Sequence, residues 1–152
     1  LAQMRAHMRP GDALVLAVDG PVEHARMVRA YDDAAGVTAA FNLNVLNVVN
    51  RTLGASFDAT AFRHRAVFNA EASRIEMHLV SQHAQAIALG TGQVLRLQAS
   101  EHIVTEHSYK HAPARAEQLL RGAGFDQLQR FGIDGEAYGV YLARIGHAES
   151  ER

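Results

Sequence analysis

The chain has 152 residues, of which 48% are hydrophobic, and a formal net charge of -1. This length supports one ordinary core, or one small domain with part of another. Acidic and basic residues are interspersed, so the positive field that nucleic-acid binding needs is missing. The longest apolar run, residues 13–18, is far shorter than the roughly 20 residues that cross a bilayer. We expect a small-molecule partner, no nucleic acid, no membrane and, by default, a cytoplasmic location.

The chain opens with a helix followed by a strand. Residues 1–8 have helical character, and residues 12–19 are predicted to form a buried strand that ends in an acid. A helix that leads into a fully apolar strand is typical of an α/β sheet.

Two helices are predicted next, over residues 21–30 and residues 37–53, and Gly54 closes the second. Asparagine is a mediocre helix former, so the asparagines of the second helix are interpreted as a solvated face. They are Asn42, Asn44, Asn47 and Asn50.

After residue 58 the hydrophobic period changes from near 3.6 to 2, which indicates antiparallel strands. We expect a meander of about five strands, over residues 63–69, 74–81, 85–89, 93–97 and 102–109. The chain then returns to an α/β pattern, with a helix over residues 113–121 and strands over residues 125–131 and 137–145.

A nucleotide-like cofactor is usually bound by a Gly-rich turn between a strand and a helix. Gly90-Thr91-Gly92 leads into a strand and is predicted to be a hairpin turn. Gly122-Ala123-Gly124 ends a helix, where glycine supplies a left-handed cap. The sequence therefore predicts no complete cofactor site within these residues.

The sequence has no cysteine, which excludes disulfides and thiolate metal sites. Nine histidines could bind a metal, since imidazole is a common ligand. His102 and His107 are five apart on one predicted strand, so they point to opposite faces, and the others are scattered. We expect surface or hydrogen-bonded histidines and no metal site.

Glu106 and Ser108 lie two apart on the last strand of the predicted meander. A carboxylate and a hydroxyl at this spacing project to the same side, with Val104 beside them. Such a pair can bind a ring that offers an N–H donor and a second polar nitrogen. The spacing also allows Glu106 to lie on a solvated face, and Met77 to be a plain core residue.

Several longer segments match a known family in order and spacing. They read AYDDAAGVTAAFNLN (residues 30–44), NR (50–51), FD (57–58), FRHR (62–65), RIEMHL (74–79) and TEHSYK (105–110). Together they resemble the histidine-specific, S-adenosylmethionine-dependent N-methyltransferases of the ergothioneine pathway, over residues 10–124.

This resemblance implies the C-terminal part of a class I methyltransferase Rossmann sheet with an inserted helical and antiparallel β substrate-binding domain. The implied parts are a late Rossmann strand (residues 1–20), the insertion (21–111), a helix with the last two strands (112–146) and a tail (147–152). The residues that bind S-adenosylmethionine would mostly precede Leu1, so this piece alone would be inactive.

The implied reaction transfers methyl groups from S-adenosylmethionine to the α-amino group of L-histidine, with a monomer as the default state. By resemblance, the residues of the chain bind substrate and perform no covalent chemistry. They are Tyr31 toward the substrate carboxylate, Thr38, Phe41 and Met77 in the pocket wall, and Glu106 with Ser108 toward the imidazole. Two alternatives stay open, namely a methyltransferase of another amino acid or amine, and a non-catalytic small-molecule binding module.

Overall fold

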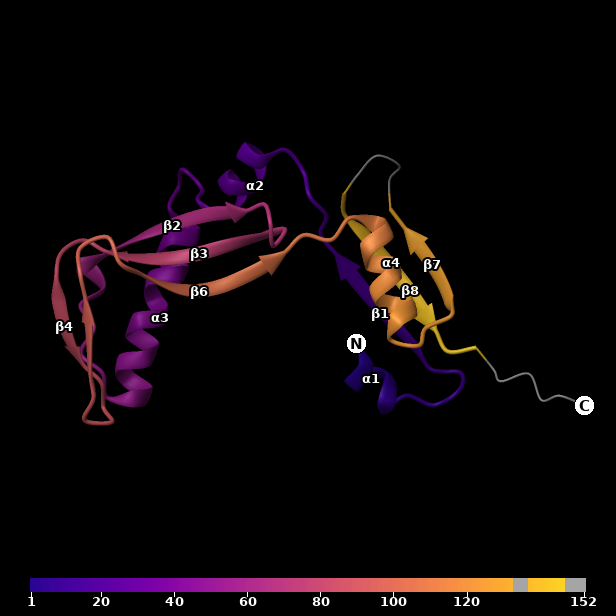
Figure 1. Cartoon of the computed structure of the whole chain (residues 1–152), viewed down its shortest axis with the longest axis horizontal. Helices are drawn as coiled ribbons and strands as arrows, with labels where there is room; N and C mark the ends of the chain where they lie inside the picture. The colour runs from indigo at the N-terminus through magenta and orange to yellow at the C-terminus, as the bar shows by residue number, and fades with distance from the viewer. Residues whose placement is uncertain (133–136, 147–152) are drawn as a thin grey trace, which may run out of the picture. The chain divides into compact units, whose positions relative to one another are not determined.

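The computed structural model describes residues 1–132 and 137–146, and the expected tail over residues 147–152 lies outside them (Figure 1). The chain divides into two compact units. Unit 1 comprises Leu1–Val22 and Tyr109–Arg152, and unit 2 comprises Glu23–Ser108. Both contain helices and antiparallel strands, so the expected α/β class is confirmed as a mixed α/β protein with antiparallel sheets.

Unit 1 contains a three-stranded sheet in the order β1-β8-β7. Its strands are β1 (Ala13–Val18), β7 (Gln127–Phe131) and β8 (Gly139–Arg144). Because β8 pairs antiparallel with both neighbours, β1 and β7 run in the same direction. The unit also contains the helices α1 (Ala2–Ala6) and α4 (Pro113–Gly122).

The core of unit 1 joins α4 to one face of this sheet. Leu120, Phe125 and Tyr141 are fully buried in it, and Leu16 packs against them from β1. Val15, on the other face of β1, is 66% exposed. The prediction of a wholly buried first strand is therefore wrong, because β1 is an edge strand of the described sheet and packs on the core through one face.

Unit 2 begins with two helices and a short 3-10 turn. These are α2 (His24–Tyr31), α3 (Val37–Leu53) and η1 (Ala59–Ala61). The predicted bounds of α3 are confirmed, and Gly54 ends the helix with a φ of +66°, in the left-handed region that favours glycine. α2 begins three residues later than predicted, because the Glu23 carboxylate caps it by accepting from the N–H groups of Ala25 and Arg26.

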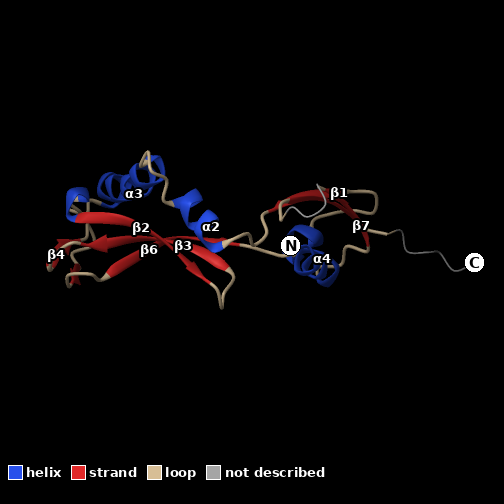
Figure 2. Cartoon of the chain, turned by 90° about the horizontal axis from the view of Figure 1, so that it is seen from above, coloured by secondary structure: helices blue, strands red, loops and turns tan. Residues whose placement is uncertain are grey.

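The strands of unit 2 form two separate sheets. β2 (Phe62–Asn69), β3 (Arg74–Ser81) and β6 (His102–Tyr109) pair in the order β2-β3-β6. β4 (Gln85–Ala88) and β5 (Val94–Leu97) form an antiparallel pair of their own. Both α2 and α3 lie on one side of the three-stranded sheet (Figure 2).

The expected five-strand meander is therefore wrong in part: β2 pairs with β3 and β4 with β5 as expected, but β3 does not pair with β4, nor β5 with β6. Ser81, at the end of β3, exchanges backbone hydrogen bonds with Ser100 and Glu101 just before β6. The chain between them leaves as the β4–β5 hairpin and returns, so β6 adds to β3 and not to β5. The predicted turn at residues 90–92 is confirmed, because the Leu89 N–H donates to the Gln93 carbonyl at 2.8 Å and closes that hairpin.

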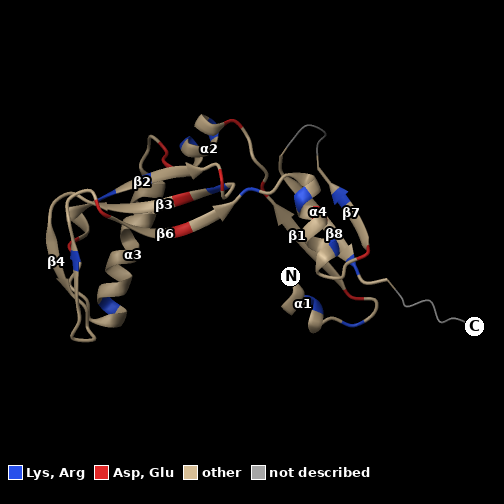
Figure 3. Cartoon of the chain, in the orientation of Figure 1, with Lys and Arg blue, Asp and Glu red and all other residues tan. Residues whose placement is uncertain are grey.

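The core of unit 2 lies between α3 and the sheet strands. Leu46 of α3, Phe62 of β2 and Leu79 of β3 are its buried centre, and Ile87 joins from the hairpin. Charged residues of both signs are interspersed along the ribbon of each unit (Figure 3). No helix among the described residues has the length and apolarity to cross a membrane.

Candidate functional site

Tyr31 is the last residue of α2, and its phenol contacts the strand that carries the other half of the expected site. The Tyr31 Oη lies 2.7 Å from the Ser108 Oγ on β6, at hydrogen-bonding distance. The two residues are 77 positions apart in the sequence. The structure thus brings together one residue from each of two distant motif segments.

Asp33 stabilises the turn between α2 and α3. Its carboxylate accepts hydrogen bonds from the backbone N–H groups of Thr38 (2.8 Å) and Val37 (3.1 Å) at the start of α3. These bonds, with that of Thr38 foremost, lower the pKa of Asp33 to about 2. Tyr31 at the end of α2 and the half-buried Thr38 at the start of α3 therefore lie on either side of the turn that Asp33 stabilises.

Asn42 is 0% exposed, and each polar atom of its side chain has a partner. Its Nδ2 lies 2.9 Å from the His64 Nδ1 and donates to the His78 carbonyl at 3.4 Å. Its Oδ1 accepts from the Thr105 hydroxyl at 2.6 Å, and that hydroxyl also lies 3.0 Å from the Met77 carbonyl. A buried polar network therefore links α3 to all three strands of the sheet.

The asparagines of α3 do not share one environment, so their interpretation as a solvated face is wrong for two of them. Asn42 lies in the network described above. Asn50 donates to the Phe57 carbonyl and accepts from the Phe57 N–H, both at 2.8 Å. Asn44 and Asn47 are exposed, as expected. Two of the four asparagines thus make hydrogen bonds outside the helix, which offset their mediocre helix propensity.

Met77 and Phe41 have opposite exposures. Met77 is 3% exposed on β3, between the fully buried Ile75 and Leu79. Phe41 is 65% exposed on α3 although its neighbour Asn42 is buried, since successive helical residues point about 100° apart. Neither side chain is part of the Tyr31–Ser108 hydrogen bond.

Glu106 is exposed on β6, and its carboxylate forms no hydrogen bond or ion pair within the part of the chain that the structure describes. Exposure alternates along β6 as far as Glu106 and then shifts at His107, so Ser108 is half-buried. The placement of Glu106 and Ser108 on one face stays a prediction. A carboxylate in this setting is accessible to a ligand.

A second polar cluster surrounds Glu76 on β3. Arg74 donates to its Oε1 from Nε (2.8 Å) and Nη2 (2.7 Å), and Asn69 and His78 donate to the same carboxylate. Arg74 first, then His78 and Asn69, lower the pKa of Glu76 to about 2. Burial lowers the pKa of His78, whose ring stacks on that of His102 with centroids 4.2 Å apart. These partners engage both oxygens of the carboxylate, which indicates a structural role.

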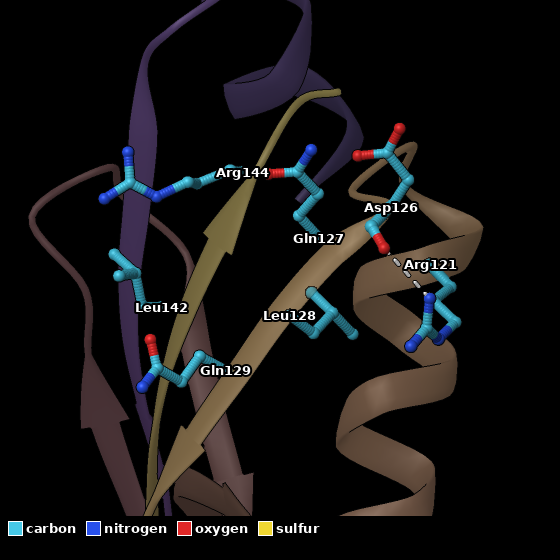
Figure 4. A pocket seen from close by; sticks show the side chains of 7 residues that line it. All are labelled: Arg121, Asp126, Gln127, Leu128, Gln129, Leu142 and Arg144. Atoms are coloured by element: carbon cyan, nitrogen blue, oxygen red, sulfur yellow. Dashed lines mark hydrogen bonds between the residues drawn. The ribbon is translucent and has the colours of Figure 1, made fainter. Parts of the chain in front are cut away.

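Unit 1 has its own polar features, which contain none of the expected site residues. Asp19, the acid that follows β1, pairs with the 2% exposed Lys110 at 2.7 Å. An open cavity of about 370 Å³ lies beside α4 and β7, where Arg121 donates to the Asp126 carbonyl at 3.1 Å (Figure 4). It is lined by Arg121, Asp126, Gln127, Leu128, Gln129, Leu142 and Arg144.

The described residues contain no strand–turn–helix segment rich in glycine. Gly90 and Gly92 belong to the β4–β5 hairpin, and Gly124, with a φ of +90°, follows α4 as predicted. Among the described residues, no group of three or more His, Asp or Glu side chains is arranged to hold a metal ion. The hydroxyl pair of Tyr31 and Ser108 and the exposed carboxylate suit recognition of a polar small molecule.

Three residues of this region, Asn42, His64 and Thr105, were missed by reasoning from the sequence. The mediocre helix propensity of asparagine drew attention to Asn42, but Asn44 and Asn47 of the same helix share it and are exposed. His64 and Thr105 lie within the FRHR and TEHSYK segments, but nothing in their spacing shows that they meet Asn42.

The model of one protein family, described as histidine-specific, S-adenosylmethionine-dependent methyltransferase, matches residues 1–145. The chain belongs to this family. The resemblance carried by the motif segments is thereby confirmed, and the buried network around Asn42 lies within those segments.

Three curated relatives of this methyltransferase-family chain carry related names. The histidine N-alpha-methyltransferase of Mycolicibacterium smegmatis is 42% identical over 144 residues, and that of Mycobacterium tuberculosis is 40% identical over 144 residues. Each alignment covers 94% of this chain but 45% of the relative. Ergothioneine biosynthesis protein 1 of Neurospora crassa is 28% identical over 140 residues, which is 88% of this chain and 15% of that protein. The chain therefore spans less than half the length of the curated relatives it matches.

Proposed function

We propose that this chain is part of an N-methyltransferase that transfers methyl groups from S-adenosylmethionine to the α-amino group of L-histidine. The observation that carries the proposal is the 2.7 Å contact between Tyr31 and Ser108. It joins two segments that match the family in sequence, and it puts hydroxyls from both beside each other. Such hydroxyls can donate and accept hydrogen bonds, as an amino-acid ligand requires.

Within this proposal, unit 2 is the inserted substrate-binding domain and unit 1 is the C-terminal part of the Rossmann sheet. The support for the second assignment is the strand order, in which β8 runs antiparallel between β1 and β7. Further support comes from α4, which precedes β7 in the chain. The insertion would begin after Val22 and end at Ser108.

We assign the substrate contacts to the motif residues of unit 2. Tyr31 would contact the substrate carboxylate, and Glu106 with Ser108 would contact the imidazole. The exposed Glu106 and Phe41 are open to a ligand, which supports this assignment. Thr38 and Met77 would complete the pocket wall, with the buried Met77 holding its position through packing.

The catalytic contribution of these residues would be orientation. Holding an unprotonated amine next to the methyl group that the cofactor supplies can account for several kcal/mol of barrier reduction. A carboxylate facing the imidazole would also select the substrate. A competitor without a ring N–H leaves that carboxylate unpaired, at a cost of about 1–3 kcal/mol.

The described residues do not fit S-adenosylmethionine as a complete site. Their two glycine-rich segments form a hairpin turn and a helix end, and neither is the strand–turn–helix that approaches such a cofactor. We therefore propose that the cofactor binds mainly through a part of the protein outside this chain, in line with the greater length of the relatives.

Calorimetry on the full-length protein tests the proposed function. L-histidine and its α-N-methylated forms are titrated in the presence of the demethylated cofactor, and methyl transfer is followed by mass spectrometry. We expect saturable histidine binding, at least about 10-fold weaker binding of phenylalanine, and methylated histidine as product. Methylation of a different amine would indicate another acceptor, and the absence of any methyl transfer would indicate a binding module.

A further inference from the structure

The imidazole of His64 lies between the backbone of Tyr31 and the buried amide of Asn42. Its Nε2 lies 2.8 Å from the Tyr31 carbonyl oxygen, and its Nδ1 lies 2.9 Å from the Asn42 Nδ2. The ring is half-buried on β2, while its two partners belong to α2 and α3. One side chain thus bridges two helices and the sheet on which they pack.

The chemistry of the partners determines the tautomer of His64. A carbonyl oxygen only accepts, so Nε2 carries the proton and donates it to Tyr31. Nδ1 is then the acceptor for the Asn42 amide. The orientation of that amide is in turn determined, because its Nδ2 also donates to the His78 carbonyl and its Oδ1 accepts from Thr105. Both hydrogen bonds of the His64 ring therefore have a defined direction.

The carbonyl that His64 binds belongs to the last turn of a helix. Tyr31 ends α2, and carbonyls in the last turn of a helix need a donor from elsewhere. His64 supplies that donor, while Ser108 holds the other end of the residue at the phenol oxygen. Together, these two contacts restrict the orientation of the Tyr31 side chain relative to α2.

We propose that His64 is a positioning residue for the amino-acid substrate, acting through Tyr31. It contacts no substrate itself. Its Nε2–H orients the end of α2 so that the Tyr31 phenol is preorganised, and Asn42 keeps the imidazole in the required tautomer. The inference rests on the proposed function, since it concerns the same substrate site.

Two substitutions at residue 64 separate its hydrogen bond to Tyr31 from its hydrogen bond to Asn42. In His64→Gln the amide reaches the position of Nε2, so a donor to Tyr31 is kept and the acceptor for Asn42 is lost. In His64→Asn the amide sits near the position of Nδ1, so the acceptor for Asn42 is kept and the donor to Tyr31 is lost. Each variant loses one hydrogen bond and keeps the other, and because Asn is one methylene shorter than Gln, the thermal stability of both is measured alongside.

Histidine affinity, cofactor-product affinity and thermal stability are measured for both variants in the full-length protein. We expect His64→Asn to weaken histidine binding about 3- to 10-fold, as the loss of one neutral hydrogen bond allows. His64→Gln should stay within about 2-fold of the parent, and cofactor affinity should be unchanged in both. In a Tyr31→Phe background, we expect a smaller additional effect of His64→Asn, because the two residues act as a unit.

A purely structural role predicts a different result. Equal losses of histidine affinity in the two variants, in proportion to their stability, would overturn the proposal, as would an unchanged affinity in His64→Asn. Failure of the unsubstituted full-length protein to bind histidine would contradict the proposed function itself. Its histidine affinity is measured independently of the two variants.

A measurement on the unsubstituted protein covers the case in which a variant does not fold. Nitrogen-15 spectra should show His64 as the Nε2–H tautomer, with its proton exchanging more slowly after addition of L-histidine than after addition of the cofactor product. The Nδ1–H tautomer, or equal protection by both ligands, would overturn the proposal.

Discussion

Three carboxylates of unit 2 differ in their surroundings, and two of them stabilise the fold. Asp33 caps α3, and Glu76 is held by Arg74, His78 and Asn69. The Glu106 carboxylate has no hydrogen-bonding partner within the described residues. The exposed carboxylate of Glu106 is accessible to a ligand, which supports the role proposed for it.

We expect Glu106→Gln to weaken histidine binding by the full-length protein about 10- to 100-fold, since a charge-assisted hydrogen bond to the imidazole is replaced by a weaker one. Affinity for the cofactor product should be unchanged. Calorimetry with both ligands measures this. Glu71→Gln, an exposed glutamate of the same unit, is the matched control. An unchanged histidine affinity in Glu106→Gln would remove this residue from the site.

Asp33→Asn should change how stability depends on pH. The pKa of Asp33 is lowered to about 2 from an ordinary value of 3.8. Its contribution is therefore fully present above pH 3.8 and is lost as the pH falls toward 2. The variant should be less stable than the parent at pH 7, and the difference should shrink between about pH 4 and pH 2. Urea unfolding at a series of pH values measures this, and a constant difference would contradict it.

At the scale of elements, the close approach of the β4–β5 hairpin to the end of α3 depends on Gly90. A Cβ at this position would lie 1.6 Å from the Leu53 carbonyl oxygen, which is backbone and cannot rotate away. The hairpin is also tied to the segment after α3, since Ser56 and Ala88 exchange hydrogen bonds of 3.0 and 3.1 Å. Glycine at residue 90 thus allows the hairpin to dock.

Gly90→Ala should destabilise the protein by about 1–3 kcal/mol, since the added methyl group forces the backbones apart. The control is Gly122→Ala at the end of α4, where an added Cβ meets nothing within 4 Å. That substitution should be neutral or stabilise by up to about 1 kcal/mol. Thermal unfolding compares the two, and equal midpoints would show that the hairpin moves freely.

Elements with strong local signals were predicted within a residue or two, but the partner strand of β6 was not. α3, β3 and β6 have the predicted bounds, because helical period, glycine cap and strand alternation are local properties. Which strand β6 joins depends on contacts across the intervening hairpin. The predicted meander was wrong in part because alternation identifies a strand without naming its neighbour.

At the scale of the whole molecule, the isolated chain should not bind S-adenosylmethionine with micromolar affinity. The described residues lack the Gly-rich strand–turn–helix that allows a backbone to approach such a cofactor. Calorimetry on the isolated 152 residues, with the full-length protein as positive control, measures this. Micromolar binding by the isolated chain would contradict the proposal that the cofactor residues lie elsewhere.

The sequence by itself determined the family, the α/β class and most element bounds, because each follows from ordered motifs or from periodicity within one segment. Only the tertiary structure decided that Tyr31 meets Ser108, and that Asn42 is buried against His64 and Thr105. These contacts join segments between 22 and 77 residues apart. A polar residue in a sequence looks the same whether it faces water or a distant partner. Its burial depends on which elements pack over it, which no local pattern specifies.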